Sequence, residues 1–343
     1  METNGLEALL VTDIRSIRYL TGFTGSSAYA VVTAKANWFL TDSRYTTQAG
    51  EEVEGFKVKT YKKALEEIKK LVEDSKINKL GFESNNLTYD TFLKIKKALK
   101  AVKLIPVPSL VAKVRERKDL FEIARIKESV KILDKGFELA QKILRPGAAE
   151  KDIAFEIELG FRRAGGDGLA FDTIIASGYR GALPHGKASQ KKIRKNELVV
   201  VDMGVILNGY NSDETRTYCI GKATAEQKKI YQTVKDAQER AIERIKPGVK
   251  ASFIDEGARG YIEQAGYGKF FGHGTGHGVG LEIHEGPVVG PFSKDVLEVG
   301  MVITVEPGIY VPELGGVRIE DMALVVKGGF ELLTKTSKDF VCL

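Results

Sequence analysis

Two segments of the sequence share one plan: LRPGAAEKDIAFEIELGFRRAG at residues 144–165 and IKPGVKASFIDEGARGYIEQAG at residues 245–266. In each segment a Pro-Gly pair ends one helical pattern and an Ala-Gly pair ends the next, and equivalent positions lie 101 residues apart. Two unrelated helices could both end in Pro-Gly by chance, but these segments agree at both ends. We therefore expect a duplication: two copies of one α/β unit, packed face to face with a cleft between them.

The long helix before each segment has its own start signal. Asp119 with Glu122, and Thr224 with Gln227, have the spacing of a capping box. Helices are therefore expected over residues 120–144 and 225–245. In the first, apolar residues recur at spacings of three and four, which predicts a single apolar stripe. A coiled-coil seam has the same spacing, but about three heptads is short for one, and packing against a sheet is the better interpretation.

The first 110 residues alternate short apolar runs with helical patterns, which is typical of an α/β domain. Strands are expected at residues 8–11, 28–33, 38–41, 56–61 and 79–82, and helices at residues 63–73 and 89–100. A segment with two prolines, residues 104–110, is interpreted as the end of this domain, where the chain leaves it. We divide the chain into an α/β domain, residues 1–112, and a second domain, residues 113–343.

Composition excludes several classes of protein. The 343 residues are 43% hydrophobic and 29% charged, which is typical of a folded chain of about two domains rather than a disordered one. The net charge of +6 is spread out, and the densest basic run, residues 191–195, reads as a solvated loop, so no nucleic acid is expected. Two cysteines cannot form a disulfide framework. Residues 1–5 do not resemble a signal peptide and no apolar run could span a membrane, so a cytoplasmic location is expected.

A first pair of acids lies on a predicted hairpin. The apolar run Leu198 to Val201 ends in Asp202, and Asn208-Gly209 then separates it from a second run, residues 210–218. Asn-Gly favours a two-residue turn, which places Asp202 opposite Thr215 and on the same face as Asp213. Two carboxylates so close repel each other unless a cation lies between them. Two exposed acids on a wet hairpin are the alternative, and the apolar run argues against it.

The duplicated half offers the same arrangement. Another apolar run, residues 301–305, ends in Glu306, and a Gly-Gly pair at residues 315–316 precedes Glu320. By the duplication, Glu306 corresponds to Asp202 and Glu320 to Asp213. The turn residues do not fix the register of this second pair, so a common face for its acids does not follow from the sequence.

Three of the four histidines fall within twelve residues, in the glycine-rich stretch GHGTGHGVGLEIHEGP at residues 272–287. They are His273, His277 and His284, and glycines at this density allow the backbone to approach a ligand closely. Four carboxylates with one or two histidines form a hard, oxygen-rich site that suits Mn²⁺, Fe²⁺ or Co²⁺. Four acids would overcharge one ion, so we expect a dinuclear centre, whose ions lie about 3.5–4 Å apart and hold a nucleophilic hydroxide.

One motif points elsewhere. Gly181 to Lys187 has the G-x-x-x-x-G-K spacing of a phosphate-binding loop. Ala188 follows where a hydroxyl residue should bind Mg²⁺, so we do not interpret the segment as such a loop.

Together these segments resemble the creatinase and methionine-aminopeptidase superfamily, and more narrowly its Xaa-Pro aminopeptidases and proline dipeptidases. The resemblance rests on VDMG (201–204), SDETRT (212–217), residues 272–287, EPG (306–308) and RIED (318–321), and on LTGFTG (20–25) and TDSRY (41–45) in the first domain. It covers the whole chain. It implies an α/β (α+β) fold with an N-terminal creatinase-like α/β domain and a C-terminal pita-bread domain of two pseudo-symmetric halves.

The resemblance also implies roles for individual residues. The metal ligands would be five residues: Asp202, Asp213, His277, Glu306 and Glu320. His284 would contact the substrate, Glu306 would also transfer a proton, and His185 and His273 match further active-site histidines. Arg318 and Tyr310 match positions that orient ligands. Glu214 stands where the family has an apolar residue, but on the face opposite Asp213.

The implied function is hydrolysis of the bond between an N-terminal residue and a following proline by two divalent ions. Mn²⁺ is expected, with Co²⁺, Fe²⁺ and Zn²⁺ as alternatives. The TDSRY segment is closer to the aminopeptidase branch, so we expect a homodimeric Xaa-Pro aminopeptidase acting on peptides with proline at the second position, with Xaa-Pro dipeptidase as the alternative. A metal-free creatinase-like enzyme and a metal-free peptide-binding module are disfavoured because all five ligand positions are filled.

Overall fold

A six-stranded sheet organises the first of two compact units into which the chain divides, residues 1–115 and 116–343, in a computed structural model that describes residues 5–343. The expectation of no signal peptide falls mostly on residues 1–4, which lie outside the described residues. The strands run in the order β4-β3-β2-β1-β5-β6. They are β1 (Ala8–Val11), β2 (Ala28–Thr33), β3 (Asn37–Asp42), β4 (Lys57–Tyr61), β5 (Lys79–Phe82) and β6 (Lys103–Pro106).

Helices cover both faces of this sheet because its strands are apolar on both sides. Alternate residues of β1 pack in opposite directions: Leu10 faces α3 (Ala64–Asp74) and α4 (Tyr89–Ala98), and Leu9 faces α1 (Ile14–Thr21) and α2 (Thr46–Glu52). The predicted α/β domain is thus confirmed. The prediction missed three helices, α1, α2 and α5 (Leu110–Arg115), since helices of six to eight residues contain too few turns for a clear period. It also missed the strand β6, whose residues fall mostly in the segment with two prolines that was interpreted as the exit from the domain.

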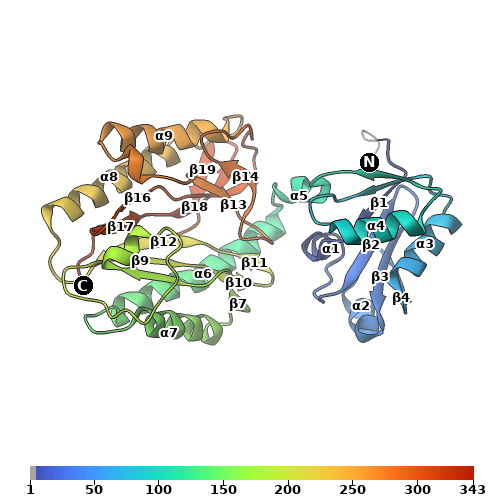
Figure 1. Ribbon diagram of the computed structural model, residues 1–343, viewed down its shortest axis with the longest axis horizontal. Helices are drawn as coiled ribbons and strands as arrows, with labels where there is room; N and C mark the ends of the chain where they lie inside the picture. Colours follow the sequence, from blue (N-terminus) through green and yellow to red (C-terminus); the bar gives the residue numbers. More distant parts are fainter. Residues whose placement is uncertain (1–4) are drawn as a thin grey trace. The chain divides into compact units, whose positions relative to one another are not determined.

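The second unit contains two helix pairs. The first is α6 (Leu120–Ile143) and α7 (Glu150–Arg163), and the second is α8 (Ala225–Ile242) and α9 (Ala251–Gln264). Asp119 and Thr224 cap α6 and α8 in complete capping boxes, as predicted. Figure 1 shows one pair on each side of the strands. No helix among residues 5–343 is both long and apolar enough to cross a membrane.

Strands of the second unit lie between these helix pairs. The core of α6 and α7 includes β8 (Ile174–Ser177), β9 (Leu198–Met203) and β12 (Glu214–Cys219), whereas that of α8 and α9 includes β15 (Val302–Val305) and β18 (Asp321–Val326). The remaining strands are β7 (Gly168–Leu169), β10 (Val205–Leu207), β11 (Tyr210–Asn211), β13 (Gly276–Gly278), β14 (Glu285–Val289), β16 (Gly308–Val311), β17 (Gly315–Arg318) and β19 (Gly329–Leu332). Two similar halves therefore face each other, which confirms the predicted pita-bread fold.

Each half contains one long hairpin. At its acidic residues, both strands of the hairpin leave one sheet and continue in another. In the first, Asn208 and Gly209 both have positive φ, as a type I′ turn requires, and Asp202 pairs with Thr215 as predicted. Residues 210–218 do not form one strand, however: they divide into β11 and β12 on either side of Ser212 and Asp213. In the second, β15–β18 and β16–β17 keep one register through a similar break at Glu306 and Glu320.

Candidate metal centre and active site

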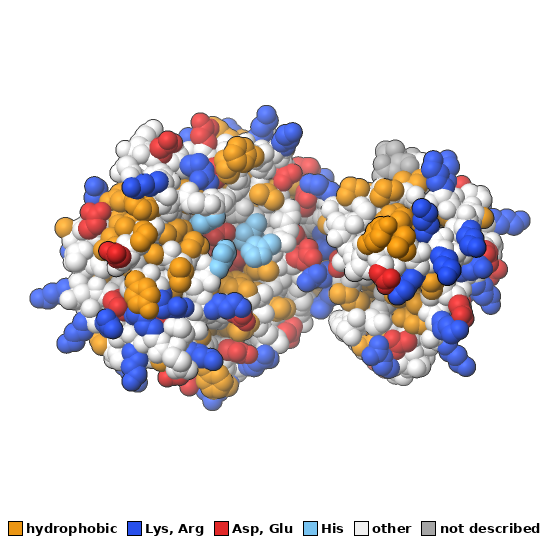
Figure 2. Space-filling view, in the orientation of Figure 1, with side chains coloured by type: hydrophobic (Ala, Val, Ile, Leu, Met, Phe, Trp, Pro, Cys, Tyr) orange, Lys and Arg blue, Asp and Glu red, His pale blue; other side chains and the backbone are white. Residues whose placement is uncertain are grey.

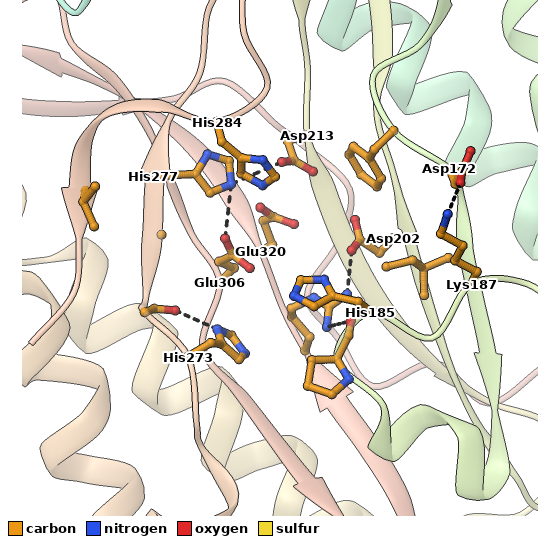
Figure 3. A pocket seen from close by; sticks show the side chains of 17 residues that line it. Asp172, His185, Lys187, Asp202, Asp213, His273, His277, His284, Glu306 and Glu320 are labelled. Carbon is orange, nitrogen blue, oxygen red and sulfur yellow. Dashed lines mark hydrogen bonds and ion pairs between the residues drawn. The ribbon is translucent and has the colours of Figure 1, made fainter. Parts of the chain in front are cut away.

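A cavity of about 490 Å³ opens in the second unit, where the two hairpins meet. All five predicted ligands line it: Asp202, Asp213, His277, Glu306 and Glu320. The other three histidines, His185, His273 and His284, line it as well. Figure 2 shows the histidine side chains gathered in a hollow on the surface, and Figure 3 shows carboxylates and imidazoles pointing into a common space. The fold thus brings together acids that are more than a hundred residues apart in the sequence.

The centre of the site is a cluster of two acids and one histidine. One possible ligand atom from each of Asp213, His277 and Glu320 lies within 4.8 Å of the other two. His277 Nε2 is 3.6 Å from Asp213 Oδ2 and 3.3 Å from Glu306 Oε1. These separations leave room for an ion among the side chains, and the donors are the types that hard divalent ions prefer.

The charges of this cluster are not balanced by the protein alone. Burial, and then the charge of Asp202, raise the pKa of Asp213 well above its usual value. Burial and the neighbouring acids do the same for Glu320. The Oδ1 atom of Asp202 is buried without a hydrogen-bond partner. Buried carboxylates that repel one another and an orphaned carboxylate oxygen are what a site for cations requires, so the residues present fit divalent ions.

The backbone fixes the orientation of the His277 ring. Its Nδ1 lies 3.0 Å from the carbonyl oxygen of Gly278, which can only accept, so Nδ1 carries a proton and donates. The lone pair of neutral His277 is therefore on Nε2, the atom that faces the carboxylates. Burial opposes charge on this ring, but Glu306 and Asp213 together raise the pKa of His277 to about 9. Conversely, burial opposes charge on Glu306, but His277 lowers the pKa of that carboxyl to about 2.

A chain of hydrogen bonds connects Asp202 with His273. Arg318 donates from Nη2 to Asp202 Oδ2 (2.5 Å) and from Nη1 to the Tyr310 hydroxyl (2.8 Å). His273 Nδ1 donates to the carbonyl oxygen of Gly274 (2.7 Å), so its Nε2 accepts from Tyr310 (2.8 Å) when the ring is neutral. Burial lowers the pKa of His273, which favours that neutral ring. Both nitrogens of His273 are thus used within the protein.

His284 and His185 have a different environment. The His284 ring lies edge-on to His277, with 4.3 Å between ring centroids, and Figure 3 shows the two side by side. Burial and the nearby His277 lower the pKa of His284, so its ring is neutral near pH 7. His185 lies in the loop after η3 (Gly178–Ala182), and Figure 3 places it on the side of the cavity where Asp202 lies. These two rings face the space that a substrate would occupy.

Sequence reasoning missed two threonines that hold the acids in place. Thr215 Oγ1 donates to Glu320 Oε2 (2.7 Å) and accepts from Arg318 Nε (3.2 Å), which joins the first hairpin to the second. Thr304 Oγ1 accepts from the backbone N–H of His277 (3.1 Å) and donates to Glu306 Oε1 (3.3 Å). The predicted pairing of Asp202 with Thr215 could have identified the first of these.

Two of the predicted ligands, Asp213 and Glu320, are each followed by another acid. The buried Arg216 compensates the charge of both, Glu214 and Asp321. Arg216 Nη2 lies 2.7 Å from both Glu214 Oε1 and Asp321 Oδ1, and Nη1 donates to the carbonyl oxygen of Glu320 (2.5 Å). Glu214 is fully buried and contacts Arg216, whereas Asp213 lines the cavity. Burial raises the pKa of Glu214 to about 8. Glu214 is therefore accommodated by Arg216, and it is not among the residues that line the cavity.

Comparison with known proteins agrees with this geometry. Residues 124–327 match metallopeptidase family M24, and residues 1–117 match the creatinase/prolidase N-terminal domain. The chain is 39% identical over 343 residues to an Xaa-Pro dipeptidase of Pyrococcus horikoshii, covering 99% of this chain and 96% of that one. It superimposes on an Xaa-Pro dipeptidase from Bacillus anthracis with a TM-score of 0.97 (41% identity, 100% and 96% covered). For an X-Pro aminopeptidase from Thermotoga maritima the TM-score is 0.91 (38% identity, 99% and 98% covered).

Proposed function

The chain belongs to metallopeptidase family M24, and on that premise we propose that it is an Xaa-Pro dipeptidase, which hydrolyses the single peptide bond of a dipeptide ending in proline. The observation that carries the proposal is the cluster of Asp213, His277 and Glu320 at the centre of one cavity. The named relatives favour the dipeptidase over the aminopeptidase that the TDSRY segment had suggested. All three match over almost the whole chain, but the B. anthracis dipeptidase has a higher TM-score (0.97) and identity (41%) than the T. maritima aminopeptidase (0.91 and 38%).

Two divalent ions would be held by five residues that line the cavity: Asp202, Asp213, His277, Glu306 and Glu320. Mn²⁺ suits a set of four carboxylates and one imidazole, and Co²⁺, Fe²⁺ and Zn²⁺ are the alternatives. When bound, such ions lower the pKa of a water molecule and polarise a carbonyl group.

Side chains of the protein would bind the substrate and transfer a proton from water to the leaving group. Glu306 lines the cavity beside His277, and its carboxylate can accept a proton from water and pass it to the departing proline nitrogen. Neutral His284 can donate a hydrogen bond to the oxygen of the scissile carbonyl as negative charge develops there. His185 faces the same space and can contact the substrate, whereas His273 acts through Tyr310 and Arg318 on Asp202.

The enzyme must recognise proline by the shape of its ring, because the peptide bond before proline has no N–H to donate. An enzyme that aligns substrates through that group therefore cannot use this bond. The cavity offers apolar side chains instead, and Phe171, Ile174, Pro184 and Val288 are among those that line it. A proline ring packed there would present the scissile bond to the acid cluster.

The homodimer and the cytoplasmic location remain predictions from the sequence. Light scattering coupled to size-exclusion chromatography would measure the assembly directly, and a monomer at micromolar concentration would contradict the dimer.

The decisive assay compares an Xaa-Pro dipeptide, an Xaa-Pro-Xaa tripeptide and a dipeptide without proline, after chelation and after addition of Mn²⁺. We expect Mn²⁺-dependent hydrolysis of the Xaa-Pro dipeptide alone. Glu320→Ala should lose bound metal, measured by elemental analysis, together with turnover. Cleavage of the tripeptide at a similar kcat/KM would restore the aminopeptidase alternative, and full activity of metal-free Glu320→Ala would refute the metal centre.

A further inference from the structure

Two side chains that line the cavity are permanently cationic, and they differ in their freedom to bind a ligand. Arg318 is buried, and four of its N–H groups are used by Thr215, Pro184, Tyr310 and Asp202. The Lys187 side chain is 74% exposed, and its Nζ donates to Asp172 Oδ2 (2.6 Å), whose side chain is 70% exposed. An ion pair that is so exposed contributes little, so the ammonium group can change partners at small cost.

The backbone of Lys187 is held firmly although its side chain is not. Its carbonyl oxygen accepts a hydrogen bond from Arg180 Nη2 (2.5 Å), and Arg180 is anchored through Nε to the fully buried Glu150 (2.9 Å). Lys187 also follows His185 by two residues on the same loop. The lysine therefore starts from a fixed point at the cavity wall and reaches out on a flexible chain. Figure 3 shows its ion pair with Asp172.

A dipeptide brings a negative charge into this cavity. Its terminal carboxylate is one residue from the scissile carbonyl, so it must lie in or beside the same cavity, where Asp202, Asp213, Glu306 and Glu320 offer it no cationic partner. Arg318 cannot turn toward it without leaving Asp202. We propose that Lys187 binds the free carboxylate of the Xaa-Pro dipeptide, exchanging Asp172 for the substrate. This inference rests on the proposed dipeptidase function and names the residue that selects for a short substrate.

Asp172 then has the role of a competitor. In the free protein it holds the ammonium group at the edge of the cavity, and the substrate carboxylate replaces it. Removing Lys187 and removing Asp172 should therefore have opposite effects on dipeptide binding, which a shared structural role of the pair would not produce.

The test uses the full-length protein and two matched substrates, Ala-Pro and its amide Ala-Pro-NH₂, which lacks the negative charge. We expect Lys187→Met to lower kcat/KM for Ala-Pro about tenfold, mainly through KM, because a charge-assisted hydrogen bond is lost. The amide should be affected less than about twofold. Lys187→Arg should restore most of the dipeptide activity, and Asp172→Asn should lower KM for Ala-Pro. Lys195→Met is the control, since Lys195 is an exposed lysine of the same unit that does not line the cavity.

Calorimetric titration with L-proline and with L-prolinamide supplies a readout that does not depend on turnover. Lys187→Met should weaken the binding of proline and leave that of prolinamide unchanged. Equal losses for Ala-Pro and its amide, or a rise in KM with Asp172→Asn, would overturn the role of Lys187 while leaving the dipeptidase standing. A wild-type protein that cleaves tripeptides but not Ala-Pro would instead overturn the dipeptidase itself.

Discussion

A buried acid of the first unit should make that unit less stable as the pH rises. Glu83 follows β5 and is only 3% exposed. Ser16 Oγ donates to its Oε1 (3.5 Å), whereas its Oε2 is buried without a hydrogen-bond partner. Burial, and then the charge of Asp13, raise the pKa of Glu83 to about 7. The folded chain therefore holds a proton at Glu83 that the unfolded chain releases at lower pH.

The sign and the size of the change in stability with pH follow from this difference in the pKa of Glu83 between the folded and unfolded chain. Because the pKa is higher in the folded state, the stabilisation is complete below the unfolded value near 4.5 and is lost as the pH rises through about 7. At about 1.4 kcal/mol per pKa unit, the loss between pH 4.5 and pH 8 is roughly 2–3 kcal/mol. Glu83→Gln keeps the size of the side chain but has no charge to bury. It should match the wild type near pH 5 and exceed its free energy of unfolding by most of that amount at pH 8.

The assay is urea unfolding followed by tryptophan fluorescence. Trp38 is the only tryptophan and lies in β3, so the signal reports on the unit that contains Glu83. Glu54→Gln, at an exposed position of the same unit, is the control and should follow the wild type at every pH. The reasoning fails if Glu83→Gln and the wild type lose stability in parallel between pH 5 and pH 8.

Three further predictions concern the second unit. His284→Ala should keep its metal and lose most turnover, whereas His277→Ala should also bind metal more weakly; equal metal contents and rates in the two variants would contradict the assigned roles. Thr215→Val should weaken metal binding about 10–100-fold, measured by competition with a chelator, because Glu320 loses the hydrogen bond that orients it; unchanged affinity would count against this. Arg216→Met should lower the free energy of unfolding by roughly 3 kcal/mol, since two buried acids lose the arginine that they share, although Lys338 stays beside Asp321; a melting temperature equal to that of the wild type would rule it out.

The sequence predicts those parts of the structure whose causes are local. Asn208 and Gly209 adopt the two positive φ angles of a type I′ turn, and that turn alone sets the pairing of Asp202 with Thr215. The capping boxes at Asp119 and Thr224 likewise involve residues only three positions apart. In such cases the interacting groups are fixed by their spacing, whatever the rest of the chain does.

The second hairpin shows where local reasoning stops. Val311 pairs with Gly315, so its loop contains three residues, with Glu313 at a φ of 69°. A left-handed glutamate is uncommon and nothing in its neighbours signals it, so the register that places Glu306 near Glu320 does not follow from the sequence. The ion pair of Lys187 with Asp172 is hidden for another reason: both side chains are exposed, and their meeting depends on the path of a loop.

The duplication explains why the site needs both halves. Each hairpin changes sheet at its acids, which turns Asp202 and Asp213 of one half, and Glu306 and Glu320 of the other, toward the same cavity. One acid of each pair is held in place by the other half. Glu320 is oriented by Thr215 of the first hairpin, and Asp202 by Arg318 of the second. Since each half supplies a hydrogen bond that positions one acid of the other, the geometry of the metal centre depends on the packing of the two halves as well as on each hairpin.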